Sequence, residues 1–132
     1  MHFAWEDWLT EDLLDLRICD LGIRIGGTWL EALVGRIHRE LARRDIRLKP
    51  RFWLADEWFS PDGIPGVAIP FYLAHPRLIR LERQQMFEAE GGTRTACLKL
   101  MRHEVGHALQ HAFQLQRRRK WQRCFGKAST PY

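Results

Sequence analysis

Residues 93–117, TRTACLKLMRHEVGHALQHAFQLQR, carry the pattern that decides the fold. Apolar side chains recur along this stretch at helical spacing, at Cys97, Leu98, Met101, Val105, Ala108, Leu109, Ala112 and Phe113. Because this spacing places apolar residues on one side of a helix, it predicts a long helix with a buried face. Thr93 or Thr95 can cap its first turn. We therefore expect the rest of the chain to pack against this helix.

Two histidines on this helix, His103 and His107, are four residues apart and therefore lie one turn apart on nearly the same face. Both can direct an imidazole nitrogen at one zinc ion, at roughly 2.0–2.1 Å. Glu104 directly follows the first histidine, and in such motifs this glutamate is the general base rather than a ligand. The ion would lower the pKa of a bound water towards about 7, Glu104 would take the proton, and the hydroxide would attack a peptide carbonyl. The spacing thus indicates a hydrolytic zinc site.

The motif is short, and its chance occurrence in a chain of this composition is roughly 2%. The alternative interpretation is a helix with two partly buried histidines and a surface glutamate. Gly106 stands inside the motif, where a glycine costs about 1 kcal/mol relative to alanine. A bare position there is useful if another segment packs against the back of the site.

A catalytic zinc needs a third protein ligand, commonly a carboxylate or a third histidine. No Asp or Glu follows His107. The metzincin pattern would place glycine and histidine where this chain has Gln110 and Phe113. His111 lies eight residues from His103, about 12 Å along the helix axis, so one ion cannot meet both of them together with His107. We expect His111 to pack or to orient a neighbour.

Weaker candidates for the third ligand lie upstream. His75 follows a predicted strand and could approach the site from there. Glu82, Glu88 and Glu90 precede the motif helix and are weaker still. The third ligand therefore stays open at this point.

The segment 28–45, TWLEALVGRIHRELARRD, predicts a second helix. Thr28 and Glu31 form a capping-box pattern, and the apolar stripe that follows is Leu30, Leu33, Val34, Ile37 and Leu41. His38 lies beside this stripe and is expected at the surface or its boundary, with no partner that would make it a metal ligand. A short helix capped by Thr10 is expected over residues 10–15.

Between the two long helices, apolar residues occur at every second position, as in a strand. Leu48, Phe52 and Leu54 predict a strand near a sheet edge, because Pro50 in the same phase cannot donate to a ladder. SPDGIPG, residues 60–66, has turn composition. The segment 66–74, GVAIPFYLA, predicts a second strand, with Val67, Ile69, Phe71 and Leu73 on one side. It is either the sheet edge that holds an extended substrate or a plain core strand. Residues 77–90 are ambiguous between helix and strand.

Length and composition are those of one soluble domain: 132 residues, 45% hydrophobic and 28% charged. The longest apolar run, residues 64–74, is too short to span a bilayer, and the acidic N-terminus differs from a signal peptide. We therefore expect a cytoplasmic protein without membrane contact.

Cys19, Cys97 and Cys124 are odd in number and far apart, so each is expected to be a small buried or semi-buried side chain rather than part of a disulfide scaffold.

The net charge of +5 is unevenly distributed. The 28 residues after Glu104 contain six basic and no acidic residues, which leaves 15 basic against 16 acidic residues in the rest. The stretch RRRKWQR, residues 117–123, could contact nucleic acid, with Trp121 stacking on a base. A solvated helix end explains it better, because cations are favourable near a helix C-terminus.

Four blocks of the sequence resemble a family of uncharacterised bacterial proteins described as zinc-binding metallopeptidases. They are DEWFSPDGIPGVAIPFYLAHPRLIRLER, EGGTR, LMRHEVGHALQHAF and RRRKWQRCFGKASTPY, and the resemblance extends from about Asp20 to Tyr132. It implies an α+β, zincin-like fold, in which a small sheet packs against the motif helix and an N-terminal helix. It also implies that His103 and His107 bind Zn²⁺ and that Glu104 is the general base, but it indicates no particular substrate.

Members of this family are gluzincin-like and continue past the point that corresponds to Tyr132, with an acidic segment that is expected to supply the third ligand. We therefore expect residues 1–132 to be a single zincin-like metallopeptidase domain that is incomplete at its C-terminus, acting on a peptide or protein. Regulatory proteases that cleave transcriptional repressors have a similar motif helix and also need a downstream glutamate. The alternative is a non-catalytic module that binds protein or nucleic acid through its basic C-terminal segment.

Overall fold

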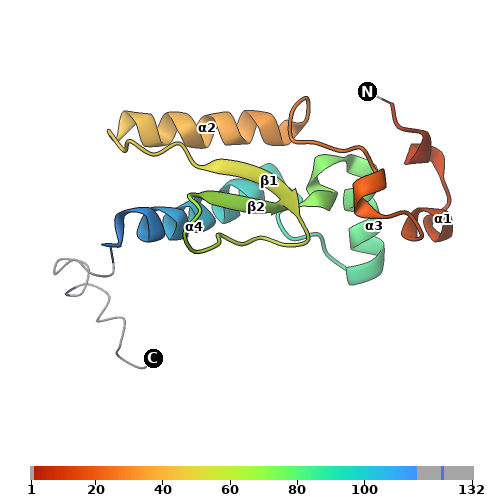
Figure 1. The fold of residues 1–132 in the computed structure, drawn as a ribbon. Coiled ribbons are helices and arrows are strands. Elements are labelled where there is room, and N and C mark those ends of the chain that lie inside the picture. The colour runs from red at the N-terminus through yellow and green to blue at the C-terminus, as the bar shows by residue number, and fades with distance from the viewer. Residues whose placement is uncertain (1, 116–122, 124–132) are drawn as a thin grey trace.

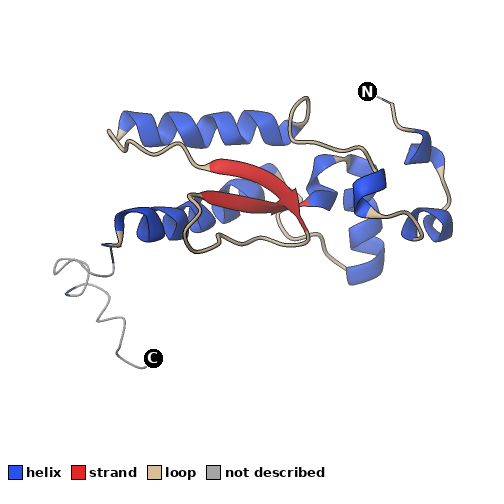
Figure 2. Ribbon diagram, in the orientation of Figure 1, coloured by secondary structure: helices blue, strands red, loops and turns tan. Residues whose placement is uncertain are grey.

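The structure is a computed structural model that describes residues 2–115 and residue 123 (Figure 1). Its helices are α1 (Thr10–Leu14), α2 (Trp29–Arg43), α3 (Pro76–Met86) and α4 (Arg94–Phe113), and its strands are β1 (Arg51–Ala55) and β2 (Gly66–Pro70). Three short 3-10 helices complete the order: η1 (Ala4–Asp7), η2 (Ile18–Asp20) and η3 (Phe71–Ala74). Helices and a small sheet are thus mixed in one core, as expected for an α+β protein (Figure 2).

The long motif helix is confirmed as α4. The Thr93 hydroxyl accepts the N–H of Ala96 at 3.2 Å, so Thr93 rather than Thr95 is the cap. The buried face consists of Cys97, Leu98, Met101, Val105 and Ala108. The predicted stripe extended further, but Ala112 and Phe113 are exposed and the left-handed Gln114 ends the helix. Arg117, the predicted end, lies outside the described residues.

Helix α2 begins where the capping pattern predicted. The Thr28 hydroxyl accepts the N–H of Leu30, while the Glu31 carboxylate accepts the N–H of Gly27 at 2.7 Å, one residue before the expected position. Leu30, Leu33, Ile37 and Leu41 are buried. His38 is a boundary residue as predicted, and its Nε2 lies 2.9 Å from the Pro50 carbonyl oxygen.

The two strands pair in parallel, with Arg51 opposite Gly66 and Ala55 opposite Pro70. The second predicted strand ends early: β2 stops at Pro70, and the chain then turns through η3. The Leu73 carbonyl accepts the Trp29 indole N–H at 2.7 Å, which ties this turn to the start of α2. The expected alternation through Phe71 and Leu73 is therefore wrong beyond Pro70.

Strand β2 has a neighbour on each side. The link between the strands crosses over, and Phe59 forms an antiparallel bridge with Ala68, in which Phe59 O accepts Ala68 N–H at 2.8 Å. All five residues of β2 are buried. Residues 66–70 are therefore a core strand, which confirms the second of the two predicted interpretations. On the side of β2 away from β1, the edge of the sheet is formed by residues 58–60.

Helix α3 resolves the ambiguous segment 77–90. His75 caps it, because its Nδ1 accepts the N–H of Arg77 at 3.0 Å, and Pro76 occupies the first turn, where a missing N–H costs little.

Helix α1 is present over the predicted residues, but Leu9 is its N-cap residue. The predicted cap, Thr10, instead bonds Gln84 and Arg77 across to α3.

Helix α4 packs on β2 and on α2, and α2 also packs on η3. An exposed ion pair joins the two long helices: the Arg102 guanidinium donates twice to the Glu40 carboxylate, at 3.1 and 2.8 Å, and this lowers the pKa of Glu40. Figure 1 shows α1 and α3 together at one end of the molecule. The C-terminal part of α4 lies at the other end. No helix of the described residues is long and apolar enough to cross a membrane.

The cysteines differ in burial, which predicts a difference in reactivity. Cys97 is fully buried and burial raises its pKa to about 12, whereas Cys19 is exposed, against expectation. At pH 8 we expect iodoacetamide to alkylate Cys19 readily and Cys97 about 1,000-fold more slowly, because so little of it is thiolate. Peptide mass spectrometry measures both rates. In urea the two rates should converge, and equal rates in the native protein would contradict this burial. Cys124 lies outside the described residues.

Candidate metal centre

Helix α4 brings the two predicted ligands together on its solvent side. His103 and His107 are both exposed, and their Nε2 atoms are 3.2 Å apart. The ring centroids are 4.8 Å apart and the planes are almost perpendicular, at 81°. The backbone is continuous helix through both residues, so the pair projects from one turn. The two rings therefore lie next to each other on one turn of α4, as the i, i+4 spacing predicts.

This separation can be tested against the geometry of zinc. Two nitrogens at roughly 2.0–2.1 Å from a tetrahedral ion are about 3.4 Å apart. The observed 3.2 Å is close to that distance, so the two rings fit the ion with only a small adjustment. The same separation also permits a hydrogen bond in which one ring donates its N–H to the other. A metal would replace that single shared proton.

Glu104 borders a hollow next to the histidine pair. The hollow has a volume of about 410 Å³ and is lined by Trp58, Phe59, Ser60, Asp62, Glu104, His107 and His111. Glu104 is half-buried in its wall, one residue from the first predicted ligand. The opposite wall is the segment 58–60 that bridges β2. A substrate placed in this hollow would therefore lie between the sheet edge and the face of α4 that carries Glu104.

His111 faces the same hollow but points to a different partner. Its Nε2 lies 3.2 Å from Asp62 Oδ1, and its ring stacks on His107 with centroids 6.5 Å apart. Its Nδ1 is buried and has no hydrogen-bond partner among the described residues. The sequence expectation that His111 orients a neighbour rather than joining His103 agrees with this arrangement. Asp62 was not foreseen, because only the crossing of the β1–β2 link brings this turn residue to α4.

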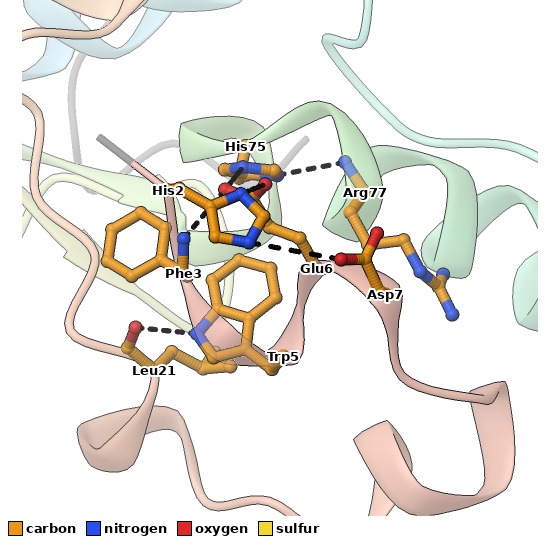
Figure 3. Close-up of polar contacts among 8 residues, drawn as sticks. All are labelled: His2, Phe3, Trp5, Glu6, Asp7, Leu21, His75 and Arg77. Carbon is orange, nitrogen blue, oxygen red and sulfur yellow. Dashed lines mark hydrogen bonds and ion pairs between the residues drawn. The ribbon is translucent and has the colours of Figure 1, made fainter.

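The weaker candidates for the third ligand lie elsewhere. His75 Nε2 is 2.9 Å from Glu6 Oε1 and its ring packs edge-on against Trp5, in the N-terminal cluster of Figure 3. The backbone N–H of Phe3 and the rings of His75 and His2 hold the Glu6 carboxylate, and together they lower its pKa. In the structure His75 therefore caps α3 and belongs to the N-terminal cluster. Glu82, Glu88 and Glu90 do not line the hollow.

Gly106 has open space around it, so no described segment packs closely against this position. A Cβ built there meets no atom within 4 Å. Gly106→Ala is therefore expected to raise the free energy of unfolding of the metal-free protein by about 1 kcal/mol, the helix propensity difference. Urea denaturation checks this.

Gly66→Ala is the matched comparison for that substitution. Its Cβ would overlap the Trp53 ring and lie 2.8 Å from the Arg51 carbonyl oxygen. This second variant should lose stability, because the overlap is with a paired strand. A loss of stability in Gly106→Ala would show that another segment covers the helix there.

Within residues 2–115 and 123, no three His, Cys, Asp or Glu side chains come together as a group that could hold a metal. The basic stretch proposed to contact nucleic acid, including Trp121, lies outside the described residues apart from Arg123. The candidate site therefore consists of two imidazoles, Glu104 and the adjoining hollow. Neither the protein-family models, the curated proteins nor the solved structures contain a match to this chain.

Proposed function

We propose that this protein is a zincin-like, zinc-dependent metallopeptidase, in which His103 and His107 bind Zn²⁺ and Glu104 is the general base. The observation that carries the proposal is the 3.2 Å separation of the two Nε2 atoms on one turn of α4. Two exposed imidazoles whose ring nitrogens lie this close together are what a shared divalent cation needs. Peptides and proteins are the proposed substrates.

The residues around the hollow can perform the proposed steps. Zinc held by the two histidines would supply a positive charge that acidifies water and polarises a peptide carbonyl. Glu104 lines the hollow, and in this proposal it takes a proton from water there and returns it to the leaving amine.

The sheet edge next to the hollow can position the substrate. The backbone N–H and C=O of Phe59 both form hydrogen bonds with Ala68. In an extended strand the backbone groups of the neighbouring residues, Trp58 and Ser60, therefore point away from β2. An extended peptide can pair with them there. This edge replaces β2 as the candidate for substrate binding.

The second candidate function is metal binding without turnover. It is favoured by one observation: among the described residues, the histidine pair has no third metal ligand beside it. Two histidines alone would hold zinc weakly and leave it without the carboxylate or third imidazole that a catalytic zinc usually has. In that case the protein would act as a binding module.

Glu104→Gln separates the two candidates. The variant should keep the zinc content of the wild type and lose hydrolysis of a fluorescent casein substrate by roughly 10²–10⁴-fold, because the amide cannot accept a proton. Glu11→Gln, at an exposed position of α1, is the matched control and should keep full activity. Zinc binding without any hydrolysis in the wild type would favour the second candidate. Undiminished hydrolysis by Glu104→Gln would exclude Glu104 as the base.

A further inference from the structure

Six basic side chains lie between the second half of α2 and the first residue of β1. They are Arg39, Arg43, Arg44, Arg47, Lys49 and Arg51, and all six are exposed. No ion pair within the described part of the chain involves any of them. Of the two acidic residues in this stretch, Glu40 is already held by Arg36 and Arg102. The stretch therefore presents positive charge that its own neighbours leave largely unneutralised.

Four of these cations border two adjoining hollows. One hollow, of about 460 Å³, has Lys49 and Arg51 in its wall, and the other, of about 540 Å³, has Arg39, Arg47 and Lys49. The two hollows share His38 and Lys49 in their walls, so they lie side by side in a groove between α2 and the start of β1. Both volumes lie in the range of ligand pockets, about 300–1,000 Å³.

The floor of this groove, which we call the basic groove, is apolar. Exposure alternates along residues 46–52: Arg47, Lys49 and Arg51 face solvent, while Ile46, Leu48, Pro50 and Phe52 face inward. Ala42 and Val34 of α2 line the helix side of the two hollows. The His38–Pro50 hydrogen bond of 2.9 Å fixes the two walls relative to each other. Apolar groups at the floor and cations at the rim thus select a ligand with both features.

We propose that the basic groove binds an acidic peptide segment of a protein partner, with its carboxylates on the arginines and its apolar side chains on the floor. Arginine binds carboxylates in paired hydrogen bonds, and aliphatic side chains suit the aliphatic lining. Single-stranded nucleic acid needs exposed aromatic faces for its bases. The two aromatic rings of the lining, Phe52 and His38, are both half-buried and pack edge-on against each other, with centroids 5.7 Å apart. The lining therefore favours the peptide.

The test is fluorescence anisotropy with labelled probes and the full chain. The probes are a twelve-residue Glu-Leu repeat, a Glu-Ser repeat, a Lys-Leu repeat and dT12. We expect the Glu-Leu peptide to bind most tightly, with an affinity that falls as salt is raised. The double variant Arg47→Glu, Lys49→Glu should weaken that binding by about tenfold or more, because two attractions become repulsions.

Matched controls locate the binding. Arg94→Glu with Lys99→Glu reverses two exposed cations on α4, far from the basic groove in sequence, and should leave the affinity within twofold. Replacing Arg117, Arg118, Arg119 and Lys120 with glutamine tests the basic C-terminal segment in the same way. His103→Ala should also keep the affinity, so this proposal stands or falls separately from the metal site. Thermal melting confirms that each variant is folded.

Three results would overturn the proposal. The first is that the double variant Arg47→Glu, Lys49→Glu binds the Glu-Leu peptide as tightly as the wild type does, or that the C-terminal glutamine variant no longer binds it. The second is dT12 or the Glu-Ser peptide binding as tightly as Glu-Leu, because nucleic acid or charge alone would then account for the surface. The third is no binding of any acidic probe at low salt by a folded protein.

Discussion

Replacing His107 with alanine is expected to lower the zinc affinity of this protein by more than about 100-fold. Even outer-shell partners of zinc ligands typically contribute 10–100-fold, so the loss of one of two direct imidazole ligands should exceed that. His107 is exposed, and its ring contacts are with His103 and His111 on the same helix face. The variant should therefore fold as the wild type does, and the loss can be read as a loss of ligation.

Isothermal titration with ZnCl₂ measures this effect. His2→Ala is the matched control, because it removes an exposed imidazole from the N-terminal cluster in Figure 3 and leaves α4 unchanged. The control should bind zinc with wild-type affinity. If His107→Ala binds zinc as tightly as the wild type, the ion is held by other groups and the proposed centre is wrong.

Met101→Ala is expected to lower the free energy of unfolding by about 2–5 kcal/mol, the range for truncating a buried large side chain. Met101 has no exposed surface and lies on the face of α4 that packs against the core. Removing its side chain leaves a cavity under the turn that carries His103. Urea denaturation followed by circular dichroism gives the value.

Met86→Ala is the matched comparison, because Met86 is 64% exposed at the end of α3. It should change the free energy of unfolding by less than about 0.5 kcal/mol, as surface substitutions do. Similar losses in the two variants would contradict the assignment of the buried face of α4. That face determines which side of the helix is left for the histidines.

The parts of the fold that local sequence determines were predicted well. Both long helices begin at the predicted threonines, because a capping side chain and an apolar stripe act within a few residues of each other. The end of α4 was placed too late, since whether a helix turn is buried depends on what covers it. The local pattern predicts Thr10 as a cap, but its hydroxyl bonds Gln84 and Arg77 of α3 instead.

The parts that depend on long-range pairing were not predictable. Strand β2 ends at Pro70, and the chain then turns through η3, where the Leu73 carbonyl accepts the indole N–H of Trp29, 44 residues away. The approach of Asp62 to His111 likewise depends on the bridge between Phe59 and Ala68. For the candidate site, the spacing of His103 and His107 was sufficient, because helix geometry alone brings their nitrogens together. The walls of the hollow next to them come from tertiary structure.

The most direct test of the shared ion is zinc K-edge X-ray absorption of the zinc-loaded protein and of His103→Ala. The wild type should show two imidazole nitrogens at roughly 2.0–2.1 Å, and the variant one. A spectrum with fewer than two imidazoles in the wild type, or one that His103→Ala leaves unchanged, would contradict the proposal that this turn of α4 holds a metal.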